Sequence, residues 1–208
     1  MPSPGSDPSR SRRTALRLEM ATIGWNVGEA ALTLWLGAVA GSLALLGFGT
    51  VSVVEVFASA VVLWHLSPRL EIADPARTAR ALRLVGLSFA VLGVTLIATA
   101  TRDLVTAREP DASPWGVAYL ALTAVVMFAL AAMKRRSAAG LDAAPLLSEA
   151  SLTFLDGVLS LATMTGLALN AWAGWWWADP IAGALVGVAA LAEARENRAE
   201  ASEIAAPA

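Results

Sequence analysis

Long apolar runs interrupted by single carboxylates constrain this chain more than any other feature of its sequence. Across residues 20–68 the only charged side chains are Glu29 and Glu55. A helix needs about 20 apolar residues to cross a bilayer, so a run of this length predicts two crossings. The small residues Gly41 and Ser42 mark the expected break between the two helices.

Further runs with few or no charges follow. They lie at residues 84–101, 114–133, 146–170 and 175–192. With 57% hydrophobic and only 15% charged residues among 208, the composition is that of a membrane protein. We therefore predict an all-α polytopic membrane protein, a bundle of six transmembrane helices. The helical domain is expected at residues 18–193, between a flexible N-terminal tail (1–17) and a short C-terminal tail (194–208).

Basic residues separate the connections into two groups. Arginine and lysine gather before the first run, between the second and third, after the fourth and after the sixth. These residues are Arg10, Arg12, Arg13, Arg17, Arg69, Arg77, Arg80, Arg83, Lys134, Arg135, Arg136, Arg195 and Arg198. Because short cytoplasmic loops carry the positive excess, we predict that both termini are cytoplasmic and that the chain lies in the cell inner membrane.

Aromatic and capping residues fit this topology. Trp115, Trp172 and the run Trp175–Trp177 fall at the opposite ends of the helices, where indole rings favour the membrane interface. Asp179, followed by Pro180, is expected to be the N-cap of the last helix. The single histidine, His65, is interpreted as an interfacial residue at the cytoplasmic edge rather than a ligand.

Charge and composition exclude several classes of function. With 15 basic and 17 acidic residues the formal net charge is −2, so no nucleic-acid partner is expected. The lack of cysteine excludes a disulfide framework, thiolate metal ligands and a cysteine nucleophile. An intramembrane aspartyl enzyme is not expected either, because Asp156-Gly157 has no matching carboxylate motif in another run. We predict no catalytic residue and no cofactor, and membrane lipid as the surroundings.

Acidic residues near the middle of the runs are the strongest functional signal. Glu29, Glu55 and Asp156 would sit at similar depths, within a turn or two of the bilayer centre at about 1.5 Å per residue. Carboxylates inside a bilayer are costly and normally face the bundle interior or a water-filled path. These three side chains can therefore converge on one site.

Each of these carboxylates belongs to a polar stripe at helical spacing. The stripes are Thr22, Asn26, Glu29 and Thr33; Ser52, Glu55 and Ser59; and Glu149, Thr153, Asp156, Ser160 and Thr163. We expect the first, second and fifth helices to line the functional path, with the third and sixth peripheral. Carboxylates with hydroxyls suit a divalent cation and can carry protons in exchange. The alternative is a structural network in which Glu29 or Glu55 is protonated and hydrogen-bonds neighbouring polar side chains.

Several weak motifs recur in one order along the chain. They are Ile23-Gly24-Trp25-Asn26 with Glu29, Gly41-Ser42 leading to Ser52-Val53-Val54-Glu55, Asp156 in the fifth run, and Trp-Ala-Asp-Pro at 177–180. Together they resemble the transmembrane domain of the cation diffusion facilitator family, in particular its short bacterial members. That family exports zinc and related divalent metals in exchange for protons. The resemblance covers about residues 18–193.

The resemblance implies a transport site made of two ligands four residues apart on the second helix and two on the fifth. Glu55 and Asp156 match the second position of each pair, whereas Val51 and Leu152 occupy the first positions. We expect a site rebuilt from oxygen ligands and less selective for zinc. The predicted metal-binding residues are Glu55, Asp156, Glu29, Glu149, Asn26, Ser52 and Thr153.

The resemblance also implies a function. We predict a transporter of zinc-type divalent cations, working by proton-coupled efflux and alternating access. The family's cytoplasmic metal-binding domain is not expected in the short C-terminal tail, so a homodimer would be held by its membrane helices. The departures at Val51 and Leu152 leave an alternative open, a non-transporting member of the fold that acts as a membrane interaction or regulatory protein.

Overall fold

The computed structural model describes residues 8–40, 43–67, 74–107 and 114–206. Within these residues the chain forms six helices and no strand, which confirms the predicted all-α bundle. The helices are α1 (Pro8–Ala40), α2 (Leu43–His65), α3 (Pro75–Val105), α4 (Pro114–Ala139), α5 (Ala144–Ala173) and α6 (Ala178–Ala205). The break predicted at Gly41 and Ser42 falls between α1 and α2, although these two residues lie outside the described ranges.

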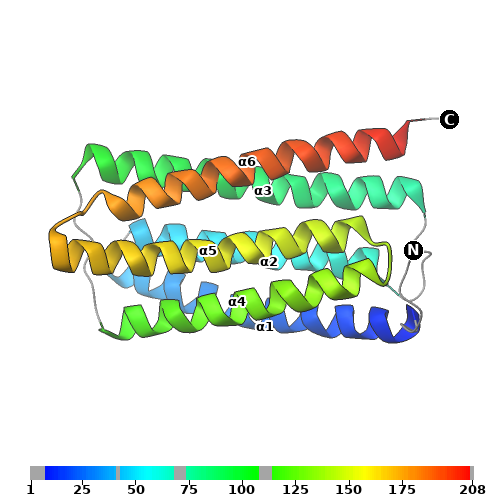
Figure 1. Ribbon diagram of the computed structural model, residues 1–208, viewed down its shortest axis with the longest axis horizontal. Helices are drawn as coiled ribbons and strands as arrows, with labels where there is room; N and C mark the ends of the chain where they lie inside the picture. Colours follow the sequence, from blue (N-terminus) through cyan, green and yellow to red (C-terminus); the bar gives the residue numbers. More distant parts are fainter. Residues whose placement is uncertain (1–7, 41–42, 68–73, 108–113, 207–208) are drawn as a thin grey trace.

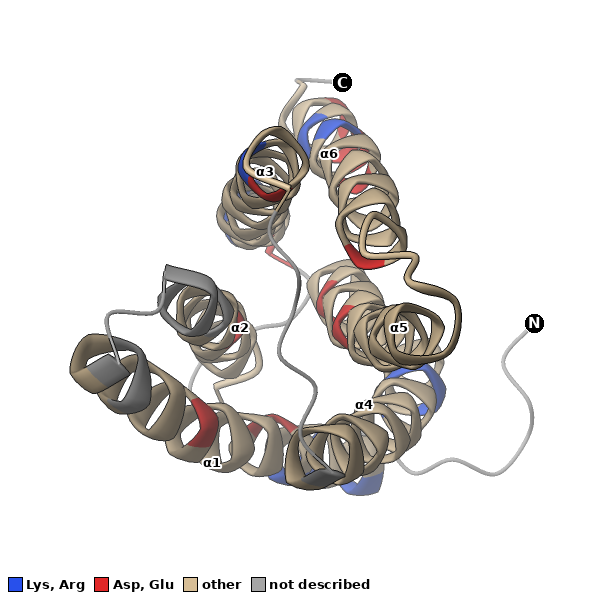
Figure 2. Ribbon diagram, turned by 90° about the vertical axis from the view of Figure 1, so that its left-hand side faces the viewer, with Lys and Arg blue, Asp and Glu red and all other residues tan. Residues whose placement is uncertain are grey.

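The helices stack as three layers of two (Figures 1 and 2). The pair α3 and α6 forms one outer layer, α2 and α5 form the middle layer, and α1 and α4 form the other outer layer. In the described part of the chain, α3, α4 and α5 are each long and apolar enough to cross a membrane, and Gly49–His65 in α2 is a shorter apolar helix. The layered arrangement gives the middle helices two faces, each covered by a different pair.

The two ends of the bundle differ in composition. Helix α1 begins and α6 ends at the same end, which we call the arginine end because Arg12, Arg77 and Arg136 lie there (Figure 1). We call the other end the tryptophan end, because Trp115 begins α4 there and Trp172 lies in the last turn of α5. Arg69 lies outside the described residues; the other basic residues predicted to share an end lie at the arginine end, and the predicted tryptophans lie at the opposite end.

At the arginine end, side chains from two neighbouring helices bind backbone carbonyls in the last turn of α2 and in the two residues that follow it. The Arg12 guanidinium donates through Nε to the Leu66 carbonyl at 2.9 Å, and through Nη2 to the Ser67 carbonyl. Arg77 of α3 donates to the Trp64 carbonyl and stacks over the Trp64 ring at 4.9 Å. The final carbonyls of a helix have no partner within the helix, so these arginines satisfy them.

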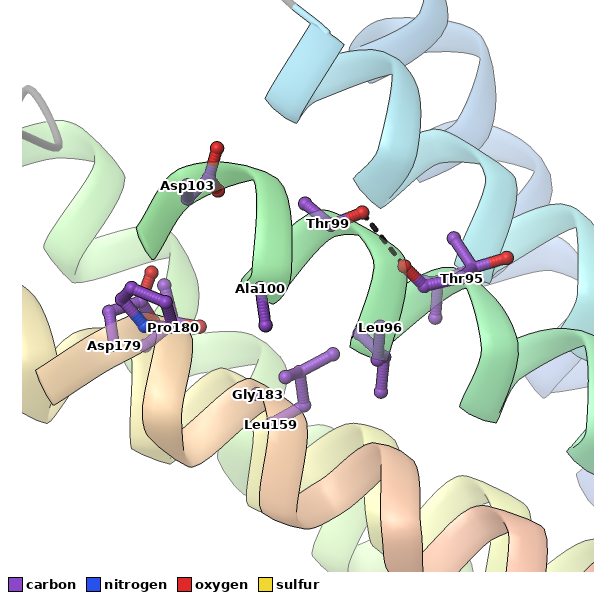
Figure 3. Close-up of a pocket in the computed structure, with 11 residues that line it drawn as sticks. Thr95, Leu96, Thr99, Ala100, Asp103, Leu159, Asp179, Pro180 and Gly183 are labelled. Carbon is purple, nitrogen blue, oxygen red and sulfur yellow. Dashed lines mark hydrogen bonds between the residues drawn. The ribbon is translucent and has the colours of Figure 1, made fainter. Parts of the chain in front are cut away.

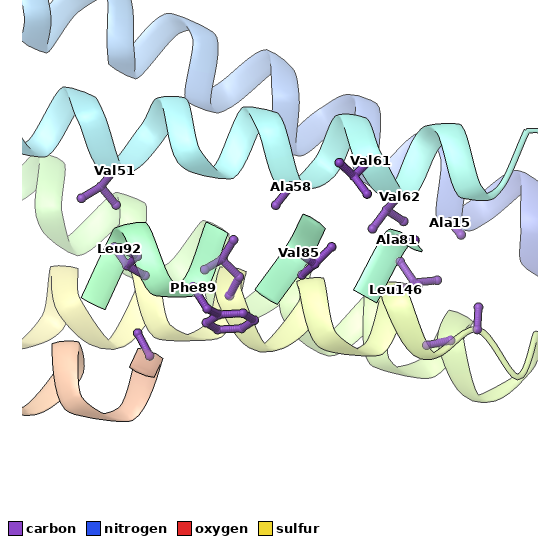
Figure 4. Close-up of a cluster of buried hydrophobic side chains, with 14 of the residues drawn as sticks. Ala15, Val51, Ala58, Val61, Val62, Ala81, Val85, Phe89, Leu92 and Leu146 are labelled. Atoms are coloured by element: carbon purple, nitrogen blue, oxygen red, sulfur yellow. The ribbon is translucent and has the colours of Figure 1, made fainter. Parts of the chain in front are cut away.

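An apolar cluster fills the space between the middle layer and α3 (Figure 4). Phe89 of α3 lies at its centre and has no exposed surface. The other members include Val51, Ala58, Val61 and Val62 of α2, Val85 and Leu92 of α3, and Leu146, Leu152 and Leu159 of α5. This face of the middle layer is therefore held by close packing of aliphatic side chains.

Glycines bring α3 and α6 into backbone contact, and these two helices make the most extensive contact between any two described helices. A Cβ atom added at Gly93 would lie 2.7 Å from the Gly187 carbonyl oxygen, and one added at Gly187 would lie 3.0 Å from the Gly93 carbonyl oxygen. Small residues at helix contacts in membranes allow such close approach. The third and sixth helices thus form a tightly packed pair.

The structure differs from the predicted tails. Residues 1–7 and 207–208 lie outside the described residues, but the helix α1 already begins at Pro8 and Ala15 is fully buried. At the other end α6 continues through the predicted tail to Ala205, because Ala201 packs against Ala79 and Leu82 of α3. Alanine gives little hydropathy signal, so neither contact was visible in the pattern of apolar runs.

Candidate functional site

Polar side chains gather between the middle layer and the layer of α1 and α4. All but one of the residues in the predicted stripes are buried, and Thr163 is half-buried. The prediction that these stripes face the interior is confirmed. The hydrogen bonds between them divide the group into three levels, from the tryptophan end to the arginine end.

The level nearest the tryptophan end is built around Glu29. Its carboxylate accepts a hydrogen bond from the Ser52 hydroxyl at 3.0 Å and another from the Tyr119 hydroxyl at 2.6 Å. The Tyr119 ring also stacks on Trp25, with ring centroids 6.5 Å apart. Helix α4 therefore contributes to the site, although the sequence analysis placed only the first, second and fifth helices there.

The middle level contains Glu55 and Asp156. Asn26 donates to Glu55 Oε2 at 2.8 Å, while Glu55 Oε1 and Asp156 Oδ2 are buried without any hydrogen-bond partner. The two side chains are only 1% and 3% exposed. A buried carboxylate oxygen without a partner is costly, so a cation or a proton at this level would be strongly favoured.

The level nearest the arginine end is built around Lys134 of α4. Its ammonium donates to both carboxylate oxygens of Glu149, at 2.7 Å each, and to Thr153 Oγ1 at 3.2 Å. Glu19 of α1 lies 3.4 Å from the same nitrogen, and the Ser59 hydroxyl donates to Glu149 at 3.0 Å. None of these five side chains is exposed, so a buried ion-pair network lies here, in which Glu19 Oε1 alone has no hydrogen-bond partner.

The prediction that Lys134 belongs to a cytoplasmic loop is wrong. The residue lies in α4 and has no exposed surface, whereas Arg135 and Arg136 beside it are exposed. The buried positions Met127, Leu130, Lys134 and Ala138 follow helical spacing. Extending the helical period past the end of the apolar run would have placed this lysine on the buried face.

Glu19 and Tyr119 were also missed, and each had a signal. Glu19 stands three residues before Thr22 and so extends the first stripe by one turn. Tyr119 is the only tyrosine of the chain, and its hydroxyl needs a partner when it is half-buried.

The predicted metal ligands are distributed over all three levels. Glu29 and Ser52 belong to the first level, Asn26, Glu55 and Asp156 to the middle one, and Glu149 and Thr153 contact Lys134. Among the residues that the structure describes, no three Asp, Glu or His side chains stand close enough together to hold a metal ion. Two of the hydrogen bonds that the structural-network alternative requires, from Asn26 to Glu55 and from Ser52 to Glu29, are present.

The resemblance implies further ligands at positions 51 and 152, but the side chains there face the apolar cluster and not the polar group. Val51 and Leu152 are 4% and 0% exposed, and both belong to the apolar cluster around Phe89. Neither side chain contributes a polar atom to the three levels. A ligand set centred on these helices must therefore rely on Glu55 and Asp156.

A cavity of about 160 Å³ lies near the tryptophan end between α3, α5 and α6 (Figure 3). Asp103, Asp179 and three threonines are among its lining residues, and Asp103 pairs with Arg102 at 3.6 Å. The prediction that Asp179 is an N-cap is wrong, because α6 begins two residues earlier than predicted, with Trp177 as its N-cap. The helix start therefore places Asp179 in the first turn, where it lines this cavity.

His65 is the last residue of α2 and is fully buried, so its side chain is enclosed by the bundle at the arginine end. Both ring nitrogens lack a hydrogen-bond partner. The residue lies in the chain between Trp64 and Leu66, whose carbonyls Arg77 and Arg12 bind. The tryptophans behave differently, since Trp115 and Trp172 are 86% and 88% exposed.

Comparison with known protein families gives one match. The model of the cation efflux transmembrane domain matches residues 80–204, which is more than half of the chain. The matched range includes Lys134, Glu149 and Asp156, and it ends within the last turn of α6. No curated protein matches the chain.

Proposed function

Because the chain belongs to the cation efflux family of membrane transporters, we propose that it carries divalent metal cations of the zinc type across the membrane. Transport proceeds by alternating access, and protons return on the carboxylates that bind the cation. The function requires a buried site whose oxygens are available to an ion. The middle level of the polar group meets that requirement.

One observation carries the proposal. Glu55 Oε1 and Asp156 Oδ2 lie on facing helices, are buried, and have no hydrogen-bond partner. Two carboxylates balance the charge of one divalent cation, and the Asn26 amide at 2.8 Å orients Glu55. Oxygen ligands of this kind suit hard and borderline divalent ions. We assign Glu55 and Asp156 as the primary ligands.

The other predicted ligands play supporting parts in this proposal. Glu29 adds negative charge near the site, and Ser52 and Asn26 supply oxygen atoms along the path between α1 and α2. Thr153 lies between Glu149 and Asp156 on α5. An oxygen-rich site predicts weaker discrimination between zinc, manganese, iron and cobalt than a site with nitrogen ligands.

The proposal includes location and assembly. We place the protein in the cell inner membrane with both termini cytoplasmic, because the arginine end carries the positive excess that marks the cytoplasmic side. We also propose a homodimer formed through the membrane helices. The exposed apolar side chains along α4 and α6, such as Val125 and Leu185, face lipid or a second copy.

A second candidate function is a non-transporting membrane interaction or regulatory protein. It is favoured by the lack of any three Asp, Glu or His side chains grouped for metal binding in the described ranges. The hydrogen bonds from Asn26 and Ser52 would then serve helix association alone. This function predicts no saturable metal binding, and crosslinks between helices that fail only when both Glu55→Gln and Asp156→Asn are introduced.

Transport in proteoliposomes tests the proposal. Purified protein is reconstituted with a pH gradient, and uptake of zinc, manganese, iron and cobalt is measured together with the movement of protons. We expect uptake of at least one of these cations, coupled to protons, and its loss in Glu55→Gln and in Asp156→Asn. Glu200→Gln, at an exposed position of α6, is the matched control and should transport like the parent.

Two results would contradict the proposal. One is a parent protein that moves none of the four cations while remaining correctly folded in the liposome. The other is transport by Glu55→Gln at the parental rate. The first result would favour the non-transporting function.

A further inference from the structure

The buried lysine of α4 is a charge that the proposed function does not use. Lys134 lies in the same polar group as Glu55, and its partner Glu149 also accepts a hydrogen bond from Ser59, one helical turn from Glu55. A transporter of cations has no evident need for a resident positive charge beside its path. The position of this ammonium therefore calls for an explanation of its own.

The contacts of Lys134 show which carboxylate it occupies. Each N–H of a lysine ammonium needs an acceptor, and Lys134 finds them in both oxygens of Glu149 at 2.7 Å and in Thr153 at 3.2 Å. Glu149 accepts further hydrogen bonds from Ser59 and Thr153. Both Glu149 oxygens are thus taken, in contrast to Glu55 and Asp156, each of which keeps one oxygen without a partner.

Depth along the bundle places Glu149 close to the proposed cation site. Glu149 and Asp156 are seven residues apart on α5, or about 10 Å along the helix axis. Glu55 lies between them, because Ser59, one turn further along α2, donates to Glu149. A cation held by Glu55 would have Glu149 as its next carboxylate toward the arginine end.

We propose that Lys134 is a tethered cation that occupies Glu149 and so confines a transported ion to Glu55 and Asp156. It is a specificity-determining residue, because its ion pair with Glu149 removes that carboxylate from the set of possible ligands. The two carboxylates that remain, Glu55 and Asp156, together balance the charge of one divalent ion. Affinity for a divalent cation rises with the number of charged ligands. An ion must also leave its site for transport to occur, so a moderate affinity serves the reaction.

This inference rests on the proposed function, and titrations of detergent-solubilised protein with zinc and manganese test it. The parent is compared with Glu149→Gln, with Lys134→Met and with the double variant. We expect Glu149→Gln to bind no more tightly than the parent, since Glu149 is not available to the ion. Lys134→Met should bind about tenfold more tightly, and the double variant should return to the parental affinity.

Two further variants make the comparison specific. Arg136→Met removes the same charge from an exposed position two residues away and should leave the affinity unchanged. Glu149→Gln is the safer variant for folding, because its amide oxygen still accepts from Lys134. A loss of affinity in Glu149→Gln equal to that of Glu55→Gln would overturn the inference, as would unchanged affinity in a folded Lys134→Met protein.

The outcomes separate this inference from the proposed function. If the parent transports cations but Glu149→Gln abolishes binding, the function stands and the role of Lys134 falls. If the parent binds neither ion but Lys134→Met gains binding that Glu149→Gln removes, the lysine occupies a cation site and the transport function falls. Binding in no variant overturns both.

Discussion

The middle layer of the bundle, α2 and α5, has two faces that are held in opposite ways. Toward α3, the contact is dominated by aliphatic side chains that pack around Phe89. Toward α1 and α4, the same two helices present Glu55, Glu149 and Asp156 to partners on those helices. Each of these two helices therefore has one face that packs against apolar side chains and another that carries charged side chains.

The apolar face and the polar face therefore have different roles: the first holds the bundle together, and the second carries the candidate site. Packing has no strong directional preference, and the close α3 and α6 backbones at Gly93 and Gly187 leave no room for rearrangement. Hydrogen bonds and ion pairs are directional, and each has discrete partners that can be exchanged for an ion or a proton. We expect the α3–α6 pair to remain fixed while contacts on the polar face change.

Removing the charge of Lys134 should have the largest effect on stability. Lys134→Met leaves Glu149 and Glu19 buried without their cation, and breaking a buried pair from one side costs about 3–5 kcal/mol. The measurement is the free energy of unfolding in mixed detergent micelles. Adding Glu149→Met should restore part of the loss, whereas a Lys134→Met protein as stable as the parent would mean that the ion pair is not formed.

A methyl group between α3 and α6 should have a smaller effect. In Gly93→Ala the new Cβ would lie 2.7 Å from the Gly187 carbonyl oxygen, so the helices must separate, at a cost of about 1–3 kcal/mol. Gly24→Ala is the matched control, since nothing lies within 4 Å of its Cβ position. Thermal unfolding of both variants checks the prediction, and equal midpoints would show that the α3–α6 contact is loose.

Loss of a single hydrogen bond on the polar face should have the smallest effect. Tyr119→Phe keeps the ring that stacks on Trp25 but removes the donor to Glu29, with an expected loss of about 1 kcal/mol. The same unfolding measurement detects it. The variant also sharpens the comparison, because a change in cation affinity without a change in stability would place Glu29 among the ligands.

The sequence predicted the fold better than it predicted the partners. Uncharged runs and basic connections were sufficient to predict six helices, with the start of α1 and the end of α6 at the same end of the bundle. Helical spacing identified which face of α1, α2 and α5 is polar. Spacing on one helix does not say which residue of another helix lies opposite. The bond from Ser59 to Glu149 joins residues 90 positions apart, and no local pattern indicates it.

Two errors have a common physical cause. Charge and low hydropathy predict the membrane boundary at Lys134 and at the ends of α1 and α6, yet Lys134, Ala15 and Ala201 are fully buried in the bundle. A charge can remain buried when its partners are buried with it, as Glu149 shows for Lys134. Alanine contacts such as those of Ala15 and Ala201 extend helices beyond the apolar runs without raising the hydropathy.

The polar contacts also bear on how the chain enters a membrane. Glu55 and Glu29 find partners on the adjacent helix, through Asn26 and Ser52, and Lys134 finds Glu149 across the short turn that joins α4 to α5. Each of these consecutive helix pairs can therefore insert as a hairpin that already neutralises or hydrogen-bonds its own polar groups, which lowers the cost of placing them in lipid. Helices α3 and α6 are remote in sequence, and their glycine contact can form only after the last hairpin has entered.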